Sequence, residues 1–445
     1  MSLGGRVLID GIRRPRHNAR SMLHPTLTSG CFALIALLGP VPSAMAQQGS
    51  SGGSSIRHAL EAQRRSAAAP DAAGSTQTLI LERRELRDPG MGGIVSHTIL
   101  VPRGWNFDGG VRWTNHPTMF VHFVGSMTAP DGPSLHFDYN RSFGYNDNEQ
   151  ALAHAGQRMG QTLADGTMLI PPPQRAGEAA ERVLLPILRP QASSVRLVSA
   201  TQIEEAERQL REFLAPMLQS MEQQNQISRA NGLGLEARSW IRVKRVRLAY
   251  TEDGQPWEEE FVYSMMGTHS STRTQFLQME SGTWQIADVR STRAPLGRLD
   301  AAMPQLVTLA RSLRETPQWS ISLQDLRAKI AEIQHRGAMD RLEIIRRSGE
   351  QIAKNNREIS DMQMRSWRSR QDFEDRVHKA VTKSIRDWRA TDGSSIAVDH
   401  AFGQVFQDPS GNLILTNDPS YDPRRDHHVN SCEWDRLNRI DPFQR

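Results

Sequence analysis

The sequence predicts an α+β protein: an antiparallel sheet flanked by helices, then a long charged helix and a small β-hairpin module at the C-terminal end. Short runs of Ile, Leu and Val that end at glycine or proline are typical of strands. Residues 237–264 have the pattern of a long β-hairpin with Asp253-Gly254 in its turn. Residues 321–389 contain no proline and are rich in Arg, Gln, Glu and Ile, which favours a helix.

The first 46 residues have the three parts of a secretory signal peptide. Arginines precede an apolar core at 30–39, which is too short to span a bilayer, and residues 43–46 form a small-x-small cleavage site. We therefore expect cleavage after Ala46 and a periplasmic or secreted protein. An uncleaved N-terminal anchor is the alternative, and Met22 is a second candidate for the start.

Charge and cysteine content limit the class of protein. The chain has a formal charge of +5, but residues 1–46 hold five arginines and one aspartate, so the remainder carries about +1. This near balance gives no reason to expect a nucleic-acid partner. Cys432 is the single cysteine after cleavage, so it is free or pairs with another molecule. Residues 47–76 are rich in Ser, Gly and Ala, which is typical of a flexible linker.

An α+β domain is expected over 77–320. Its strand at 94–101 ends at Pro102, which cannot donate to a sheet ladder. Gly104 allows a sharp turn there, and Trp105 can fold back over the sheet as a large apolar lid. Apolar runs between turn signals predict further strands at 78–81, 111–113, 118–124, 135–139, 195–198, 237–250, 258–264 and 283–290.

Helices are predicted at 149–163, 177–185 and 201–227, and from about 299 to 316. Thr201 and Glu204 have the spacing of a capping box at the start of the third helix. Pro216 is expected to kink that helix, because proline cannot donate the internal hydrogen bond.

The long hairpin carries opposite charges on its two strands: Arg242, Lys244, Arg245 and Arg247 on the first, and Glu258, Glu259 and Glu260 on the second. One interpretation is a basic groove with a neighbouring carboxylate. The other is a solvated strand face on which the charges neutralise each other. His122 and His136 also lie on predicted strands; no further ligand follows at metal-binding spacing, so we expect both to be structural.

The order of elements and one short motif resemble a known superfamily. A strand with Pro102-x-Gly104-Trp105, more strands, a helical segment, a long β-hairpin, the Trp284 strand and a closing helix are similar to the Mog1/PsbP-like superfamily. The resemblance covers about residues 77–319 and implies an antiparallel sheet sandwiched between helices. The segment from about 146 to 235 is larger than a minimal member requires. Members are mostly binding or assembly proteins, so the resemblance implies a scaffold and supplies no catalytic residue.

Residues 321–390 are predicted to form a long Arg-rich amphipathic helix, on the order of 100 Å if straight. Three interpretations are open: a helix or helical hairpin folded onto the sheet domain, a dimerising or partner-binding helix, and a segment that binds anionic lipid or nucleic acid. An isoleucine repeat over 345–359 is interrupted by glycine and asparagine, which weakens a coiled coil. Arg365 and Arg368 beside Trp367 favour an anionic contact.

Residues 391–445 are predicted to form the small β-hairpin module, with strands near 402–406 and 413–416. Its last part holds His427, His428 and Cys432, which are metal-competent residue types. Adjacent histidines do not present two ligands on one helix face, so no metal site is expected.

No Gly-rich phosphate loop, nucleophile elbow, H-E-x-x-H helix or zinc-spaced cysteine pair occurs in the sequence. We therefore expect an exported, non-enzymatic binding or assembly protein of the cell envelope, without cofactor or metal. It would present a sheet-domain surface and the charged helix to a protein partner, and the helix is compatible with peripheral contact to an anionic membrane. The candidate contact residues are Trp105, Arg242, Arg245, Arg365, Trp367 and Arg368.

Two alternatives are retained. The first is an envelope hydrolase whose site is built from carboxylates and dispersed histidines among His122, His136, His427 and His428. The second is a structural helical spacer or oligomeriser; the sequence does not predict an oligomeric state. A buried cleft with a perturbed carboxylate or histidine would favour an enzyme, whereas a flat apolar patch would favour a binding protein.

Overall fold

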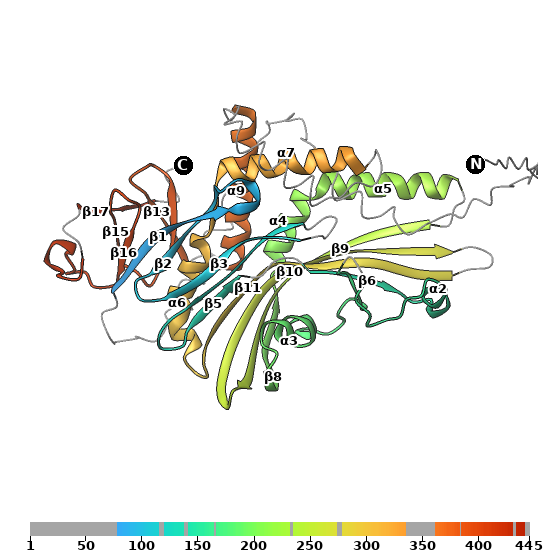
Figure 1. Cartoon of the computed structure of the whole chain (residues 1–445), viewed down its shortest axis with the longest axis horizontal. Coiled ribbons are helices and arrows are strands. Elements are labelled where there is room, and N and C mark those ends of the chain that lie inside the picture. Colours follow the sequence, from blue (N-terminus) through green and yellow to red (C-terminus); the bar gives the residue numbers. More distant parts are fainter. Residues whose placement is uncertain are drawn as a thin grey trace, which may run out of the picture.

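The computed structural model describes residues 78–114, 120–137, 141–163, 166–231, 235–273, 278–334, 361–382, 384–429 and 433–440. The expected signal peptide, the cleavage point after Ala46, the linker at 47–76 and Cys432 lie outside these residues. Within them the chain has an α+β fold, in which the strands pair mostly antiparallel and helices pack against the sheets (Figure 1). The predicted fold class is confirmed at that level.

A six-stranded sheet joins segments from near both ends of the chain. Strand β1 (Thr78–Asp88) pairs with β2 (Ile94–Pro102) on one side and with β16 (Leu413–Thr416) on the other. The strand order is β12–β2–β1–β16–β15–β17, where β12 is Arg314–Glu315, β15 is Gln404–Gln407 and β17 is Asp435–Arg436. The β15–β16 pair of the predicted C-terminal module thus continues the sheet that β1 begins.

The nine-stranded sheet is dominated by three very long strands, which curve across the molecule in Figure 1. They are β9 (Leu235–Glu252), β10 (Gln255–Arg273) and β11 (Gln278–Pro295). The main order is β3–β4–β5–β11–β10–β9–β8, with β3 (Asn106–Trp113), β4 (Val121–Thr128), β5 (Ser134–Phe137) and β8 (Ser193–Gln202). Strand β6 (Arg141–Asn146) pairs with β11, and β7 (Met168–Leu169) pairs parallel with β6.

A third, small sheet has the order β14–β13–β18, formed by Ser395–Asp399, Ile385–Arg389 and Asn438–Arg439. The longer helices are α4 (Glu204–Phe213), α5 (Ala215–Ala230), α6 (Leu299–Ser312), α7 (Pro317–Gln334) and α9 (Asp361–Val381). Short helical segments are η2 (Pro89–Met91), α2 (Glu149–His154), the π-helical η3 (Ala180–Leu184), α3 (Leu185–Leu188) and η4 (Pro423–Arg425). No helix in the described ranges is long and apolar enough to cross a membrane.

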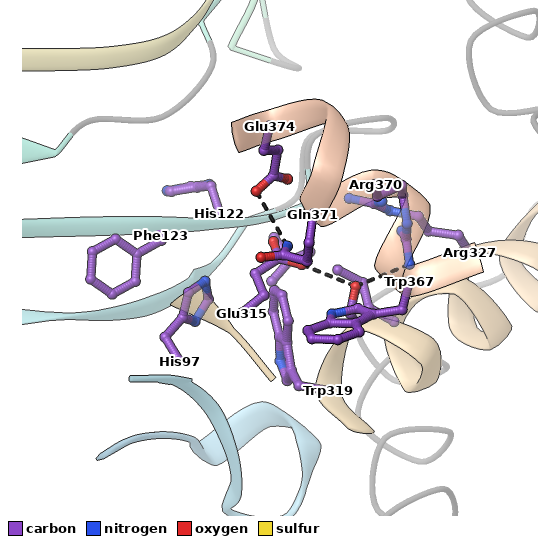
Figure 2. A pocket seen from close by; sticks show the side chains of 13 residues that line it. His97, His122, Phe123, Glu315, Trp319, Arg327, Trp367, Arg370, Gln371 and Glu374 are labelled. Atoms are coloured by element: carbon purple, nitrogen blue, oxygen red, sulfur yellow. Dashed lines mark hydrogen bonds between the residues drawn. The ribbon is translucent and has the colours of Figure 1, made fainter. Parts of the chain in front are cut away.

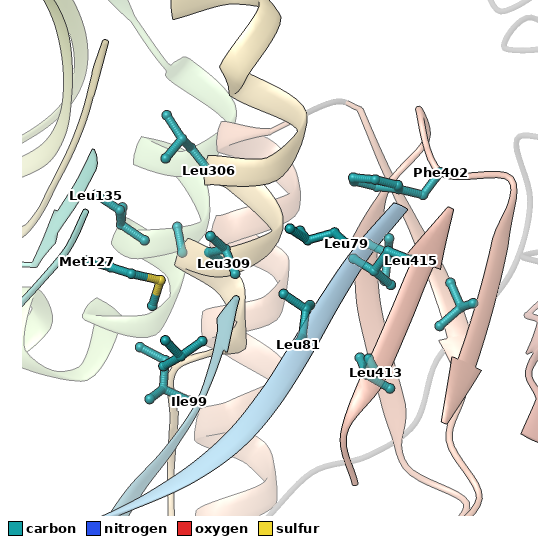
Figure 3. Close-up of a cluster of buried hydrophobic side chains, with 14 of the residues drawn as sticks. Leu79, Leu81, Ile99, Met127, Leu135, Leu306, Leu309, Phe402, Leu413 and Leu415 are labelled. Carbon is teal, nitrogen blue, oxygen red and sulfur yellow. The ribbon is translucent and has the colours of Figure 1, made fainter. Parts of the chain in front are cut away.

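The main core surrounds helix α6 (Figure 3). Leu306 and Leu309 of α6 lie between leucines of β1 and β16 on one side and Met127 and Leu135 of the nine-stranded sheet on the other. The side chains of Leu306, Leu309, Met127 and Leu135 are all fully buried. Because each such side chain stabilises the fold by about 1.5–3 kcal/mol, α6 is the element that holds the two sheets together.

The turn predicted after β2 is confirmed. Gly104 has a left-handed backbone (φ 84°), and the Trp105 N–H donates to the carbonyl of Pro102 over 3.0 Å. The half-buried Trp105 ring packs against the main core, so it acts as the apolar lid that its position predicted.

The long hairpin is also confirmed, and its strands extend beyond the predicted bounds. Asp253 (φ 50°) and Gly254 (φ 77°) are both left-handed, as a type I′ turn requires. Arg247 lies opposite Glu260 and pairs with it over 3.3 Å, and Arg245 approaches the same carboxylate at 3.5 Å. These ion pairs favour the neutralised strand face over a basic groove.

Glu259, on the other face of β10, has no exposed surface and four hydrogen bonds. Arg189 donates to both carboxylate oxygens (3.0 and 3.2 Å), and the hydroxyls of Tyr250 and Ser291 each donate over 2.6 Å. Burial, followed by the Glu259 charge, raises the pKa of Tyr250. This network ties the segment after α3 to three strands, which the sequence alone did not indicate.

The predicted capping box is wrong. Thr201 lies in β8, opposite Arg245, and α4 begins after Ile203 without a side-chain cap. The hydrogen bonds of β9 extend β8 through Gln202, so strand pairing replaces the local cap. The helix does break near Pro216: α4 ends at Phe213, Leu214 caps it, and α5 starts at Ala215. The helix predicted at 149–163 ends early, at His154.

Residues 321–390 do not form one straight helix. Helix α7 already starts at Pro317, α9 ends at Val381, and β13 occupies Ile385–Arg389. Arg370 of α9 donates to the hydroxyl of Ser320 in α7 over 3.3 Å, so the chain has folded back by that point. The Gly349 and isoleucine-repeat positions lie outside the described residues.

Asp88 connects β1 to two tryptophans. Its carboxylate is fully buried and accepts hydrogen bonds from the Gly90 N–H (2.8 Å), Trp113 Nε1 (2.8 Å) and Trp319 Nε1 (2.6 Å). Charge-assisted hydrogen bonds of this kind are stronger than neutral ones. Asp88 therefore positions the first turn of α7 against the strands.

Replacing Glu259 by glutamine is expected to lower the free energy of unfolding by about 3 kcal/mol, because it leaves the Arg189 guanidinium largely buried without its anionic partner. Chemical unfolding followed by circular dichroism measures this. Glu258→Gln, the neighbour whose side chain points to the opposite face, is the matched control and should change little. Equal effects of the two variants would contradict the assigned role.

Replacing Asp88 by asparagine is expected to lower the free energy of unfolding by about 2 kcal/mol, because an amide N–H₂ would face an indole or backbone N–H donor. Near-ultraviolet circular dichroism should change as well, since at least one of Trp113 and Trp319 loses the carboxylate oxygen that accepts from its indole. The exposed Asp108→Asn is the control. An unchanged near-ultraviolet spectrum would contradict the proposed anchoring of the tryptophans.

Candidate functional site

A cavity of about 250 Å³ lies where β2 and β4 face α7 and α9 (Figure 2). At ~30 Å³ per molecule, this is space for several waters or one compact chemical group. Its wall contains paired residue types from segments far apart in the chain: His97 and His122, Trp319 and Trp367, Arg327 and Arg370, and Glu315 and Glu374. The apolar residues Val121, Phe123 and Leu323 complete much of the remaining wall.

The pairing of β12 with β2 positions the residues on the β2 side of the cavity. Strand β12 pairs with the edge of β2 so that Glu315 lies opposite His97. The Thr316 N–H donates to the Ser96 carbonyl over 2.8 Å, and α7 then starts at Pro317, where proline is tolerated. Trp319 reaches the cavity in the first turn, with its ring centroid 4.9 Å from that of His97.

Helix α9 supplies the opposite wall. Trp367, Arg370, Gln371 and Glu374 have the i, i+3, i+4, i+7 spacing of one helix face and all line the cavity. A second face, with Phe373 and the apolar residues at 377–381, packs on α4 and β9. The helix is therefore seated on the sheet domain by one face while another closes the cavity, which agrees with the interpretation of a helical segment folded onto that domain.

A polar network connects the two helices across the cavity. The Arg370 guanidinium donates to Ser320, whose hydroxyl donates to Glu315 over 3.0 Å (Figure 2). The side-chain amide of Gln324 is oriented with its oxygen toward Arg370, and this oxygen also accepts from the guanidinium. Arg327 lies 6.0 Å from the centre of the Phe120 ring. Burial lowers the pKa of both Arg327 and Arg370, although guanidinium groups remain charged in proteins.

The titratable groups of the cavity have shifted pKa values. Burial, then the charges of Glu315 and Asp288, raises the pKa of Glu374 to about 7. Burial lowers the pKa of His97 to about 4, and burial together with Arg141 and Arg112 lowers the pKa of His122 to about 4. At neutral pH both histidines are therefore neutral, and Glu374 is present in both its protonated and its charged form.

Two buried polar atoms of the wall have no hydrogen-bond partner among the described residues. The Trp367 indole N–H is buried and has no hydrogen-bond partner among the described residues, and the same holds for Nδ1 of His97. With Arg327 and Arg370, the wall offers several donors to a group that enters the cavity. The Glu315 carboxylate of the wall already accepts a hydrogen bond from Ser320.

The residues singled out from sequence do not form one surface. Trp367 and His122 line the cavity, and Arg365 and Arg368 are exposed on α9 to either side of Trp367. Trp105 packs against the main core instead.

Two further candidates lie on β9. Arg242 donates to the Ile241 carbonyl over 2.8 Å, and Arg245 donates to the Val381 carbonyl at the end of α9. His136 lies on β5, and His427 and His428 lie in the C-terminal segment; none of the three lines the cavity.

Sequence reasoning missed His97, Trp319, Arg327 and the role of Glu374. The spacing of 367, 370, 371 and 374 on one helix face was the available signal, but the sequence analysis named only Trp367 of these four as a contact residue. Among the described residues, no group of three or more His, Cys, Asp or Glu is arranged to hold a metal ion.

The chain matches no protein-family model, and no curated protein matches it. A proposal of function therefore depends on the chemistry of the cavity and its surroundings.

The raised pKa of Glu374 predicts a specific dependence of stability on pH. The folded state binds more protons at this group than the unfolded state between about 4.5 and 7, so its contribution falls as pH rises through that window, by up to about 3 kcal/mol. His97 and His122 act in the opposite direction from about 6.5 down to 4. The difference between wild type and Glu374→Gln isolates the carboxyl group.

The measurement is urea unfolding of both proteins at several pH values from 4.5 to 8. Glu374→Gln should be increasingly more stable than wild type as pH rises. A stability difference that is independent of pH would contradict the raised pKa. Glu212→Gln, at a position on α4 outside the cavity, is the control and should show no such trend.

Proposed function

We propose that this protein is an exported, non-enzymatic binding protein of the cell envelope, and that it takes an acidic side chain of a protein partner into the cavity between α7 and α9. The observation that carries the proposal is Trp367, a half-buried ring with an unpartnered N–H at the cavity wall, flanked along the helix by exposed Arg365 and Arg368. Tryptophan and arginine are the residue types that most often dominate protein interfaces.

Electrostatics favours an acidic group as the occupant. Arg327 and Arg370 carry positive charge in the wall, while Glu315 is engaged by Ser320 and Glu374 can accept a proton. The two tryptophans and Phe123 would pack against the apolar part of the entering side chain. Exposed Arg365 and Arg368 would raise the rate of encounter with an acidic segment rather than the affinity.

The proposal also covers the family relationship, the C-terminal residues and the export of the protein. Residues 77–319 are proposed to be related to the Mog1/PsbP-like sandwich, with the Pro102–Trp105 turn as their shared feature, and 391–445 to be a C-terminal addition whose strand β16 joins the sheet of β1. Export rests on the signal-peptide pattern of 1–46. The helical spacer is disfavoured, because the contact between Arg370 and Ser320 is incompatible with a straight helix.

Replacing Trp367 by alanine is expected to weaken partner binding by roughly tenfold or more, because the variant loses both the ring contact and the indole donor. The probe is a pool of fluorescein-labelled peptides with Asp or Glu beside Phe, compared with the same peptides carrying Asn or Gln. Saturable binding of the acidic pool alone, measured by fluorescence anisotropy, is the expected result for wild type. Arg376→Gln, an exposed position on α9 outside the cavity wall, is the control.

Equal binding of acidic and amidated peptides would contradict the proposal, as would full binding by Trp367→Ala. Photocrosslinking in cells from position 368, compared with position 376, extends the test to the natural partner. Truncation after Ser320 is unsuitable, because it would remove β16 from the sheet that contains β1.

An acid–base hydrolase is the second candidate, and the pKa of Glu374 near 7 favours it, since a general acid or base works best near the operating pH. Such a site would use Glu374 as the proton donor or acceptor for a substrate in the cavity. Hydrolysis of an ester, amide or glycoside panel by wild type, abolished in Glu374→Gln, would support the enzyme. Peptide binding without hydrolysis would support the binding protein.

A further inference from the structure

Arg311 presents an unpaired charge in the interior. It lies in the last turn of α6 and is 4% exposed, and none of its three guanidinium nitrogens has a hydrogen-bond partner among the described residues. Removing the partner of a buried ion is among the most destabilising changes in proteins, because the remaining charge loses its solvation without compensation. The carbonyls at the end of α6 offset part of this energy through the helix dipole, but they form no hydrogen bond to the side chain.

Three other basic side chains lie near Arg311. Arg290 of β11, Arg314 of β12 and His378 of α9 lie close enough to influence one another electrostatically, and Arg290 and Arg314 both act on Arg311. All three of these neighbours are half-buried, so the cluster is partly accessible from solvent while Arg311 lies deepest. The Nδ1 atom of His378 is buried and also lacks a partner in the described part of the chain.

The nearby carboxylates are already engaged. Asp375 accepts from Arg314 over 2.7 Å, and Asp387 accepts from Lys379 over 2.5 Å. Asp288 accepts from the hydroxyl of Ser264 at 3.4 Å. Glu374, whose charge acts on Arg290 and Arg314, is a fourth carboxylate nearby. None of the four forms a hydrogen bond with the Arg311 guanidinium.

We propose that Arg311, Arg290, Arg314 and His378 form an anion-binding site at the junction of α6, β11, β12 and α9, and that the site takes a phosphate group. Donors that approach from four different elements suit a tetrahedral oxyanion better than a planar carboxylate, and guanidinium groups form paired hydrogen bonds with phosphate oxygens. The site goes beyond the proposed partner cavity, because none of these four residues lines that cavity. A bound phosphate would also hold α9 to α6, and so fix the helix that closes the cavity.

The test uses the mature chain and inorganic phosphate. Thermal unfolding is compared in phosphate and in chloride at equal ionic strength and pH. Wild type should unfold at a higher temperature in phosphate, by an amount that grows with the logarithm of its concentration. Arg311→Met, which keeps much of the side-chain volume, should lose this response and be at least as stable as wild type in chloride. Arg368→Gln, an exposed position on α9, should keep the response.

Isothermal titration of wild type with phosphate gives an independent result. If Arg311→Met does not fold, Arg290→Gln replaces it, and the dissociation constant of this variant for phosphate should be at least tenfold higher than that of wild type. Glycerol 3-phosphate distinguishes a lipid-type phosphoester from free phosphate, since tighter binding of the ester would identify a headgroup as the source. Wild type that responds equally to phosphate and chloride, or Arg311→Met that keeps the phosphate response, would overturn the proposal. Trp367→Ala should keep the phosphate response, so failure of the peptide-binding proposal is separable from failure of this one.

Discussion

The antiparallel pairing of β1 with β16 is the constraint on which the rest of the structure depends. It joins residues more than 300 positions apart, and the paired leucines form one side of the core around α6. With α6 held between the two sheets, its C-terminal end places β12 on the edge of β2 and starts α7 at Pro317. The wall of the cavity follows from this placement, because Glu315, Trp319 and Arg327 lie on that segment.

The cavity exists because two sets of contacts hold its walls from opposite sides. Asp88 holds the Trp319 indole beneath α7, and the apolar face of α9 around Phe373 packs on α4 and β9. Between them, Glu374, Arg370 and Trp367 face a space that no apolar side chain fills. Polar groups enclosed without full pairing reduce stability, and folded proteins retain them chiefly where a site uses them. The guanidinium of Arg311 in α6 is likewise a buried polar group without a hydrogen-bond partner among the described residues.

Local signals in the sequence were reliable where the physics is local. The Asp253-Gly254 turn, the Pro102–Trp105 turn and the break at Pro216 depend on backbone preferences of a few residues, and each occurs as predicted. The capping box at Thr201 failed because hydrogen bonds from β9 outweighed a cap worth about 1 kcal/mol. One continuous helix over 321–390 is wrong, because Arg370 of α9 contacts Ser320 of α7 and residues 385–389 pair as strand β13.

By itself, the sequence determined the α+β class, the long hairpin and the presence of an Arg- and Trp-bearing helical face at 365–374. Alternation, turn residues and helical spacing encode these features over short distances. Only the tertiary structure decided that β16 pairs with β1, that α9 returns to α7, and that His97, Trp319 and Glu374 enclose one cavity. Contacts between residues hundreds of positions apart depend on the sum of many packing energies, and no short pattern in the chain records that sum.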